Sequence, residues 1–338
     1  MVIKSNKVIV IGPLAIDYIL QFDGKFTDYV LNDFKKGKYK CNIITKNQSK
    51  YFGGTAGNIS YNLGQLNVGE IDLISSVGKD FESSGYKAHI NRFKNIKLGV
   101  NIHRDSLTAT CYIVNDIKSN QMIIFYEGAM DKFKIIDLKV KIDDSQNYIY
   151  AINSTHSVDS MIKITDQLYN LKIPMIFDPG QKIPLFSKKS LLGIIKKSNI
   201  LIGNKYEINQ IKGKINMTDQ ELIKFLKAII ITEGADGSKL IYKDYKNKIY
   251  RYNIPVSKTR AEILDTTGSG DAYRAGFLAG LILKMSLLES CYLGSVLATF
   301  VIETFGPQTH TFKLIDVKKK YLSTFGYIPQ VLGEIIES

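Results

Sequence analysis

Short runs of apolar residues alternate along most of the chain with longer segments in which apolar residues recur at helical spacing. Continuous apolar runs of this length predict strands that are buried on both faces, as in a mainly parallel sheet. We expect strands at 7–12, 71–77, 148–152, 174–178, 200–203 and 228–232. Helices are expected at 56–66, 83–93, 157–171, 219–227, 270–284 and 287–304. This order predicts a three-layer α/β/α fold with helices on both faces of the sheet.

Two segments, roughly 13–50 and 100–126, break this alternation. They contain short stretches in which apolar and polar residues alternate singly, such as 109–114 and 121–125. Single alternation is typical of a strand with one exposed face, so we expect a small antiparallel sheet here. The chain has no internal repeat and no low-complexity linker. We therefore predict one domain, 1–338, that carries the small sheet as an appendage.

The sequence contains no apolar run of about 18 residues, the length that a membrane-spanning helix needs, so we expect no membrane partner. The apolar stretch that follows Lys7 is too short for a signal peptide. Cys41, Cys111 and Cys291 are far apart and form no Cys-x-x-Cys pair, which argues against a structural zinc site. This cysteine usage fits a reducing compartment, and we expect a cytoplasmic protein.

The formal net charge of +13 raises the question of nucleic-acid binding. Only five of the 45 basic residues are Arg, the residue that makes bidentate contacts to bases and phosphates. The lysines are instead spread along helices and loops together with Ile and Asn. We therefore expect no nucleic-acid partner, although the positive field would attract small polyanionic ligands.

The most informative motif is the glycine-rich stretch 265–276, which reads Asp-Thr-Thr-Gly-Ser-Gly-Asp-Ala-Tyr-Arg-Ala-Gly. Gly268 and Gly270 allow a tight turn whose N–H groups point outward, and a helix that begins near Gly270 directs its positive end at an anion. Asp271 lies in the first turn of that helix. A carboxylate beside an anion site suits a general base that takes a proton from an attacking hydroxyl. The alternative is that Asp271 only complements the helix dipole.

Arg274 lies on the same helix face as Asp271, three residues further on. A cation in the first helical turn has the wrong sign for the helix dipole, and a bound phosphate would remove that conflict. We therefore expect Arg274 to contact the phosphate. A salt bridge to a nearby acid explains the position equally well.

Other phosphate-binding motifs are absent. No Gly-Lys pair is followed by Ser or Thr, which excludes a Walker A loop. The first strand ends in a lone Gly12 and carries no Gly-x-Gly-x-x-Gly turn. The triplet at 103–105, His-Arg-Asp, lacks the Asn that a protein-kinase catalytic loop requires, because Thr110 occupies that position.

Four motifs in order along the chain resemble those of the ribokinase or PfkB carbohydrate kinase family. They are the Gly-Gly motif and its helix at 52–62, the Asn-x-x-Glu motif at 204–207, the stretch Thr-Glu-Gly-Ala-Asp-Gly at 232–237 and the glycine-rich stretch 265–276. The resemblance covers nearly the whole chain. It implies a ribokinase-like fold in which the small β-sheet is a lid over the substrate, and ATP-dependent transfer of phosphate to a hydroxyl.

The resemblance assigns catalysis to the glycine-rich stretch. Asp271 is the expected base, and the N–H groups of Gly268, Ser269 and Gly270 are expected to stabilise the transferred phosphoryl. Ser269 stands where many members have Ala or Cys. Because the anion site uses backbone atoms, this difference should matter little.

The resemblance also assigns ligand-binding residues. The substrate side is Asp17, Gly53, Gly54 and Asn58, and the ATP side is Asn204, Thr232, Gly234 and Gly237. A carboxylate such as Asp17 can accept two hydrogen bonds from a vicinal diol. Asn204 and Glu207 are expected to organise Mg²⁺ through water, although without the resemblance they would indicate a solvated helix start. A monovalent cation near Asp265 is a further feature of the family.

The segments at 12–22, 25–28 and 127–130 look most like the bacterial and archaeal adenosine kinase branch. We therefore expect transfer to the 5′-hydroxyl of adenosine or a related purine nucleoside. Phe125 or Tyr112 could stack on the base, or could simply pack the small sheet. The alternatives are a kinase for ribose, fructose or a phosphosugar, and a non-catalytic nucleotide-sensing protein. A monomer and a homodimer through the lid are both compatible with the family.

Three further positions receive structural expectations. Residues 178–180, Asp-Pro-Gly, are expected to form a turn and not to contact the ligand. Asn62 is expected to have a structural role. His310, in the loop after the last apolar helix, is expected to be a solvent-exposed loop residue.

Overall fold

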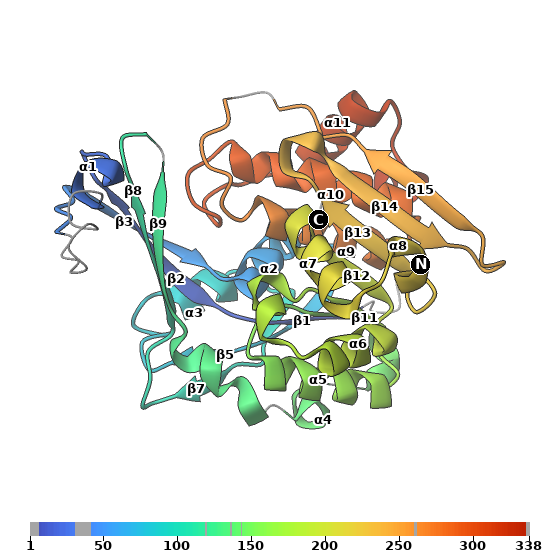
Figure 1. Ribbon diagram of the computed structural model, residues 1–338. Helices are drawn as coiled ribbons and strands as arrows, with labels where there is room; N and C mark the ends of the chain where they lie inside the picture. The colour runs from blue at the N-terminus through green and yellow to red at the C-terminus, as the bar shows by residue number, and fades with distance from the viewer. Residues whose placement is uncertain are drawn as a thin grey trace.

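The computed structural model describes residues 7–30, 42–118, 120–135, 137–142, 144–259 and 262–335. Its centre is a nine-stranded sheet of order β15-β14-β13-β12-β11-β10-β1-β4-β6 (Figure 1). The strands are β1 Lys7–Ile11, β4 Glu70–Ile74, β6 Ile96–Leu98, β10 Tyr148–Asn153, β11 Met175–Phe177, β12 Ile200–Asn204, β13 Ala228–Thr232, β14 Ser238–Lys243 and β15 Ile249–Ile254. Neighbours from β6 to β13 are parallel, and β14 and β15 pair antiparallel at one edge. The predicted mainly parallel sheet is confirmed.

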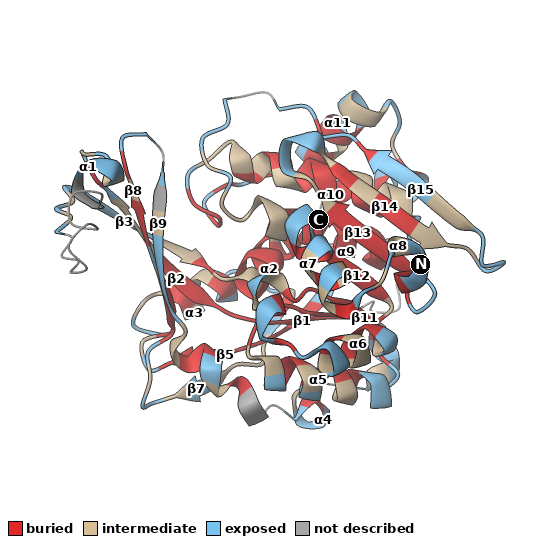
Figure 2. Ribbon diagram, viewed as in Figure 1, coloured by how far each residue is buried: buried red, intermediate tan, exposed pale blue. Residues whose placement is uncertain are grey.

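Helices cover both faces of this sheet. One layer consists of α2 Thr55–Leu66, α3 Tyr86–Asn91, α9 Ser269–Ile282, α10 Leu287–Ile302, α11 Leu314–Phe325 and α12 Gln330–Gly333. The other consists of α4 Leu138–Lys141, α5 Val158–Asn170, α6 Lys188–Lys197, α7 Lys205–Ile215 and α8 Asp219–Leu222. Alternate residues of β1 enter the two cores, with Val8 and Val10 in the first and Ile9 and Ile11 in the second. Figure 2 shows the buried strands between the layers.

A small four-stranded sheet projects from one side of the three layers (Figure 1). Its order is β3-β2-β8-β9, with β2 Ala15–Gln21, β3 Asn47–Gly53, β8 Ala109–Asn115 and β9 Gln121–Tyr126. The pair β2 and β8 is parallel, whereas the other two pairs are antiparallel. The expectation of a wholly antiparallel sheet is therefore wrong, because β2 and β8 run in the same direction. Residues 31–41, including Cys41, lie outside the described part of the chain.

Several element boundaries differ from the sequence prediction. The stretch 71–77 divides into β4 and β5 Ser76–Gly78, and β5 pairs in a separate small sheet with β7 Asn101–His103. The helix expected at 219–227 ends at Leu222, because the following residues turn into β13. The helix expected at 83–93 is shorter, since Gly85 has φ 87 and precedes its first residue. A short helix, α1 Phe26–Val30, lies at the far end of the small sheet.

The prediction omitted several elements that the structure contains, among them α6, α7, α11, β6, β14 and β15. Among the residues described, no helix has the length and apolar character to cross a membrane. Cys111 and Cys291 are free thiols.

Candidate functional site

Two helices begin side by side at the glycine motifs. Gly268 is the N-cap of α9 with φ 82, and a Cβ there would lie 2.5 Å from the Cβ of Pro307. Gly54 is the N-cap of α2 with φ 84, and its Cβ would lie 2.6 Å from the backbone nitrogen of Ala15. Both positions combine a left-handed backbone with close packing, so only glycine fits. Helix α2 packs along α9, and their positive ends therefore face one region.

The N–H groups at the start of α9 are not equivalent. The Ser269 N–H donates to Thr266 O at 3.2 Å. Within the described ranges, the N–H groups of Gly268 and Gly270 have no hydrogen-bond acceptor. The glycine-rich stretch thus presents free backbone donors at a helix N-terminus, as an anion site requires.

Asp271 lies in the first turn of α9 and is half-buried. Its Oδ2 accepts a hydrogen bond from Asn58 Nδ2 at 2.8 Å, which joins the first turns of α9 and α2. Burial raises the pKa of Asp271 to about 6, while the positive charge of Arg274 and the Asn58 bond pull it down. A carboxylate with this pKa is ionised near neutral pH and can still accept a proton readily.

The Asn58 amide is held in one orientation by buried partners. Gln308 Nε2 donates to Asn58 Oδ1 at 2.9 Å and to the Tyr86 hydroxyl at 2.9 Å. Tyr86 in turn donates to Gly53 O at 2.5 Å, and Gln308 Oε1 lies 3.0 Å from His89 Nε2. With its oxygen bound to Gln308, Asn58 must present its NH₂ group to Asp271. A chain of hydrogen bonds therefore links the two glycine motifs.

Gln308 is a site residue that the sequence does not predict. Its loop attracts attention only through His310, which is expected to be exposed. That expectation is wrong, because His310 is 2% exposed and its Nε2 lies 2.9 Å from Asn62 Oδ1. The structural role expected for Asn62 is confirmed by this contact and by its bond to Asn58 O at 2.9 Å.

Asp17 on β2 lies directly against Gly53. A Cβ on Gly53 would fall 2.1 Å from Asp17 Oδ2, so the absence of a side chain at Gly53 makes room for the carboxylate. Asp17 is buried, and that burial, reinforced by the negative charges of Asp271 and Asp265, raises its pKa to about 7. The structure thus brings Asp17 together with the motif that carries Gly53 and Gly54.

Arg274 turns its guanidinium toward Asp178, the residue that follows β11. Nε donates to Asp178 Oδ2 at 2.5 Å and Nη2 to Asp178 Oδ1 at 2.7 Å, while Nη1 donates to Gly270 O at 2.9 Å. Both side chains are buried. Burial opposes the charge on Arg274, but the ion pair raises its pKa overall. The structure therefore shows the salt bridge that the sequence left open, and Asp178 does more than form a turn.

Asn204 and Glu207 form a reciprocal cap at the start of α7. Asn204 Oδ1 accepts from Glu207 N at 2.9 Å, and Glu207 Oε2 accepts from Asn204 N at 2.8 Å. Asn204 is exposed, whereas the Glu207 side chain is buried, and its burial and the nearby Asp178 raise its pKa. The cap alone explains why these residue types stand three positions apart.

Thr232 ends β13 and pairs with Asn204 at the end of β12. Gly234 and Gly237 follow with φ 60 and φ 87. A Cβ on Gly237 would meet Ile254 O at 2.1 Å, whereas the space beside Gly234 is open. The four candidates for ATP contact therefore lie at one carboxyl edge of the sheet, where open α/β sheets bind ligands.

One face of the small sheet carries Asp17. Tyr51, Asp17, Cys111 and Phe125 are cross-strand partners in one row, so their side chains share a face. Phe125 is 45% exposed there. Tyr112 points to the opposite face, where it stacks on Tyr18 at 5.4 Å between ring centroids. Only Phe125, of the two aromatic candidates, lies on the face of Asp17.

A pocket of about 380 Å³ separates this face from the glycine-rich stretch. Its walls include Ile19, Ser49, Ile113, Leu264, Asp265 and Phe305. Asp265 accepts hydrogen bonds from Thr267 N at 2.9 Å and Gly306 N at 3.0 Å, which orders the loop beside the pocket. Apolar and polar side chains line the pocket in similar measure, so it can contact both a ring and the hydroxyl groups of a small organic ligand.

The model of the pfkB family carbohydrate kinases matches residues 14–313. A nucleoside kinase of Methanocaldococcus jannaschii is 30% identical over 310 residues, which cover 91% of this chain and 94% of that protein. The crystal structure of Methanocaldococcus jannaschii nucleoside kinase superposes with a TM-score of 0.82 at 27% identity, over 94% of this chain and 98% of that one. Burkholderia thailandensis nucleoside kinase in complex with inosine gives 0.79 at 25% identity, over 95% and 100%. The chain belongs to the pfkB, ribokinase-like family, and it is an ATP-dependent kinase that phosphorylates a hydroxyl group.

Proposed function

We propose that this kinase transfers the γ-phosphate of ATP to the 5′-hydroxyl of a purine nucleoside, with adenosine as the preferred substrate. The relatives that support this proposal are named nucleoside kinases, and the structure of one of them is a complex with inosine. The observation that carries it is the Asp271 carboxylate, which Asn58 holds at the N-terminus of α9 beside free backbone donors.

In the proposed reaction, Asp271 acts as the general base. The Asn58 bond occupies Oδ2, which leaves Oδ1 to accept the proton of the substrate hydroxyl. As that oxygen forms its bond to the γ-phosphorus, the bond from phosphorus to the leaving oxygen of ADP breaks. The N–H groups of Gly268 and Gly270 stabilise the transferred phosphoryl. Ser269 joins them through its N–H only if that group leaves Thr266 O.

The nucleoside would lie between the three layers and the small sheet. Asp17 binds the ribose diol, the backbone at Gly53 and Gly54 approaches the sugar closely, and Phe125 stacks on the base. The common face of Asp17 and Phe125 supports this arrangement. The apolar residues of the pocket beside that face, Ile19, Ile113 and Phe305, offer a wall for a flat aromatic base.

On the ATP side, we assign Thr232, Gly234 and Gly237 to the nucleotide and Asn204 and Glu207 to magnesium. The donor set consists of oxygen atoms, which suits Mg²⁺. The Asn204–Glu207 cap uses two of these oxygens, and the described ranges contain no group of three His, Cys, Asp or Glu that could hold a metal ion. These residues therefore fit an ion held through water, which neutralises charge on the ATP phosphates when bound.

In this proposal Arg274 acts on the reaction through Asp178 and Asp271. Its ion pair neutralises a buried carboxylate, and its positive charge lowers the pKa of Asp271. The monovalent cation near Asp265 and the oligomeric state stay predictions. Asp265 already has backbone partners, and β9 is an edge strand with exposed Ile123 and Ile124 that could pair with a second copy.

The test is ATP-to-ADP turnover with Mg²⁺ across adenosine, inosine, guanosine, cytidine, ribose, fructose and fructose 6-phosphate. The sugars belong in this panel because the family model describes carbohydrate kinases. Turnover selective for purine nucleosides supports the proposal. Turnover on sugars alone moves the protein to the carbohydrate branch, and tight ATP binding without turnover on any acceptor supports a nucleotide sensor.

A further inference from the structure

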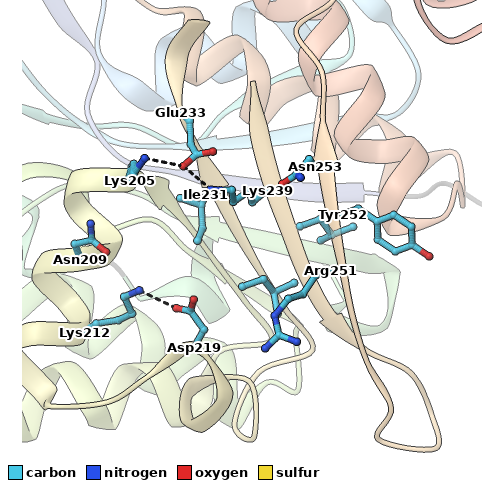
Figure 3. Close-up of a pocket in the computed structure, with 12 residues that line it drawn as sticks. Lys205, Asn209, Lys212, Asp219, Ile231, Glu233, Lys239, Arg251, Tyr252 and Asn253 are labelled. Atoms are coloured by element: carbon cyan, nitrogen blue, oxygen red, sulfur yellow. Dashed lines mark hydrogen bonds and ion pairs between the residues drawn. The ribbon is translucent and has the colours of Figure 1, made fainter. Parts of the chain in front are cut away.

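A second pocket, of about 400 Å³, begins beside the ends of β12 and β13 and extends over the face of the sheet that α7 covers (Figure 3). It is bounded by α7, by the start of α8 and by β13, β14 and β15. Ile231 and Ile241, on the core face that α7 shares, form its apolar part. Helix α9 packs on the opposite face of the sheet. None of the residues that line this pocket belongs to the hydrogen-bonded chain around Asp271.

The pocket contains four cationic side chains and two carboxylates. Glu233 lies between two of the cations, with Lys205 Nζ at 3.3 Å and Lys239 Nζ at 3.0 Å from its Oε1. Lys212 pairs with Asp219 at 3.1 Å. The charges of Lys212 and Asp219 cancel. Glu233 can compensate only one of the two ammonium groups that it contacts, so one positive charge of Lys205 and Lys239 remains.

The fourth cation is Arg251 on β15. Its guanidinium has no ion-pair or hydrogen-bond partner anywhere in the ranges that the structure describes. Cross-strand pairing places Arg251 beside Ile241, and places Asn253 beside Lys239. Lys239 is therefore the diagonal neighbour of Arg251, at a backbone separation of about 7 Å that long side chains bridge. The pocket as a whole carries two more positive than negative charges.

We propose that this pocket binds a small phosphate monoester whose organic part is apolar. Arg251 and Lys239 hold the phosphate, and the organic group lies over Ile231 and Ile241. The two uncompensated charges match a phosphate dianion, and the planar guanidinium can donate two parallel hydrogen bonds to phosphate oxygens. The volume suits a metabolite and excludes a polymer within the pocket.

The position of the pocket decides which side chains a test can change. Lys205 directly follows Asn204, and Glu233 directly follows Thr232, so variants at 205 or 233 would disturb the proposed ATP site. Arg251 is exposed and lies on the edge strand, so its replacement should leave the fold intact. Arg104, an exposed arginine outside the pocket, offers a control with the same loss of charge.

The experiment is isothermal titration calorimetry with phenyl phosphate on the full chain saturated with ADP and Mg²⁺. We expect saturable binding at one site that weakens about tenfold or more in Arg251→Gln, since a charge-assisted hydrogen bond is lost. Arg251→Lys should lose less affinity, and Arg104→Gln and Asp271→Asn should bind as the wild type does. Inorganic phosphate should bind more weakly than phenyl phosphate, because it lacks the apolar group.

Three results would overturn the proposal. The first is the absence of saturable binding by the wild type. The second is an equal loss of affinity in Arg251→Gln and Arg104→Gln, which would indicate only the general positive field. The third is loss of binding in Asp271→Asn with normal binding in Arg251→Gln, which would place the probe in the catalytic site.

Discussion

Replacing Gln308 with Leu should change both the stability of the protein and the protonation of its proposed base. Gln308 Nε2 donates at 2.9 Å to Asn58 Oδ1 and at 2.9 Å to the Tyr86 hydroxyl. Tyr86 keeps its own bond to Gly53 O, but the buried Asn58 oxygen loses its donor and the half-buried His89 Nε2 loses its contact with Gln308 Oε1. A buried polar group without a partner costs about 1–3 kcal/mol, and we expect the free energy of unfolding to fall by that amount.

The effect on catalysis follows from the orientation of the Asn58 amide. The bond from Asn58 Nδ2 to Asp271 favours the ionised carboxylate and lowers its pKa against the effect of burial. Without Gln308, Asn58 can turn its oxygen toward Asp271, and that bond is weakened. A loss of about 1.4 kcal/mol in this interaction moves the acidic limb of kcat upward by about one pH unit. Activity at pH 8 should change little.

The assay is kcat at saturating ATP and acceptor as a function of pH, with urea unfolding of the same samples. Gln65→Leu is the matched control, because Gln65 Nε2 donates to His310 O and Gln65 Oε1 accepts from Phe312 N, each at 3.2 Å, without contact to Asn58. The control should lose stability and keep the wild-type pH profile. An unshifted acidic limb in Gln308→Leu, or an equal shift in Gln65→Leu, would refute the reasoning.

Three further outcomes follow from the site. Gly53→Ala should raise KM for the nucleoside at least about tenfold, because the Cβ of the new alanine would fall 2.1 Å from Asp17 Oδ2. Steady-state kinetics should show this increase together with an unchanged KM for ATP. Arg274→Met should lower the free energy of unfolding by about 3–5 kcal/mol, because it leaves Asp178 buried and unpaired; a urea titration that shows no loss would contradict the buried ion pair. Asp17→Asn should raise the melting temperature at pH 8 and not at pH 4. The pKa of the Asp17 carboxyl is raised to about 7 on folding, so this group destabilises the protein increasingly as pH rises from about 4 to 7. An equal change in melting temperature at both pH values would contradict the raised pKa of Asp17.

Much of the fold follows from local pattern. The core strands are continuous apolar runs because both faces of the sheet are covered, and this property is visible without knowledge of their neighbours. The pattern does not show how the strands pair. The alternation in β2 and β8 predicts strands but not their relative direction, which depends on where each strand leaves the main sheet. The early end of α8 was likewise hidden, because helical periodicity continues into residues that the chain uses to return to β13.

In the site, too, residues that belong to a local motif could be predicted, whereas contacts between residues far apart in the sequence could not. Gly268 and Asp271 were identified because a tight turn, a helix start and a carboxylate occur within a few residues. Gln308 was missed because its partner Asn58 is 250 positions away in the chain, and a glutamine in a loop has no distinctive local signal. The partner of Arg274 was left open for the same reason, since Asp178 comes from a different strand.

The central claim is that Asp271 takes the proton from the acceptor hydroxyl, and Asp271→Asn tests it most directly. Asn keeps the size of the side chain and removes its ability to act as a base. We predict that kcat with adenosine falls about a thousandfold, while the dissociation constants of ATP and adenosine, measured by calorimetry, change less than about threefold. If Asp271→Asn keeps kcat within about tenfold of the wild type, the hydroxyl is activated by another group and the proposed mechanism is wrong.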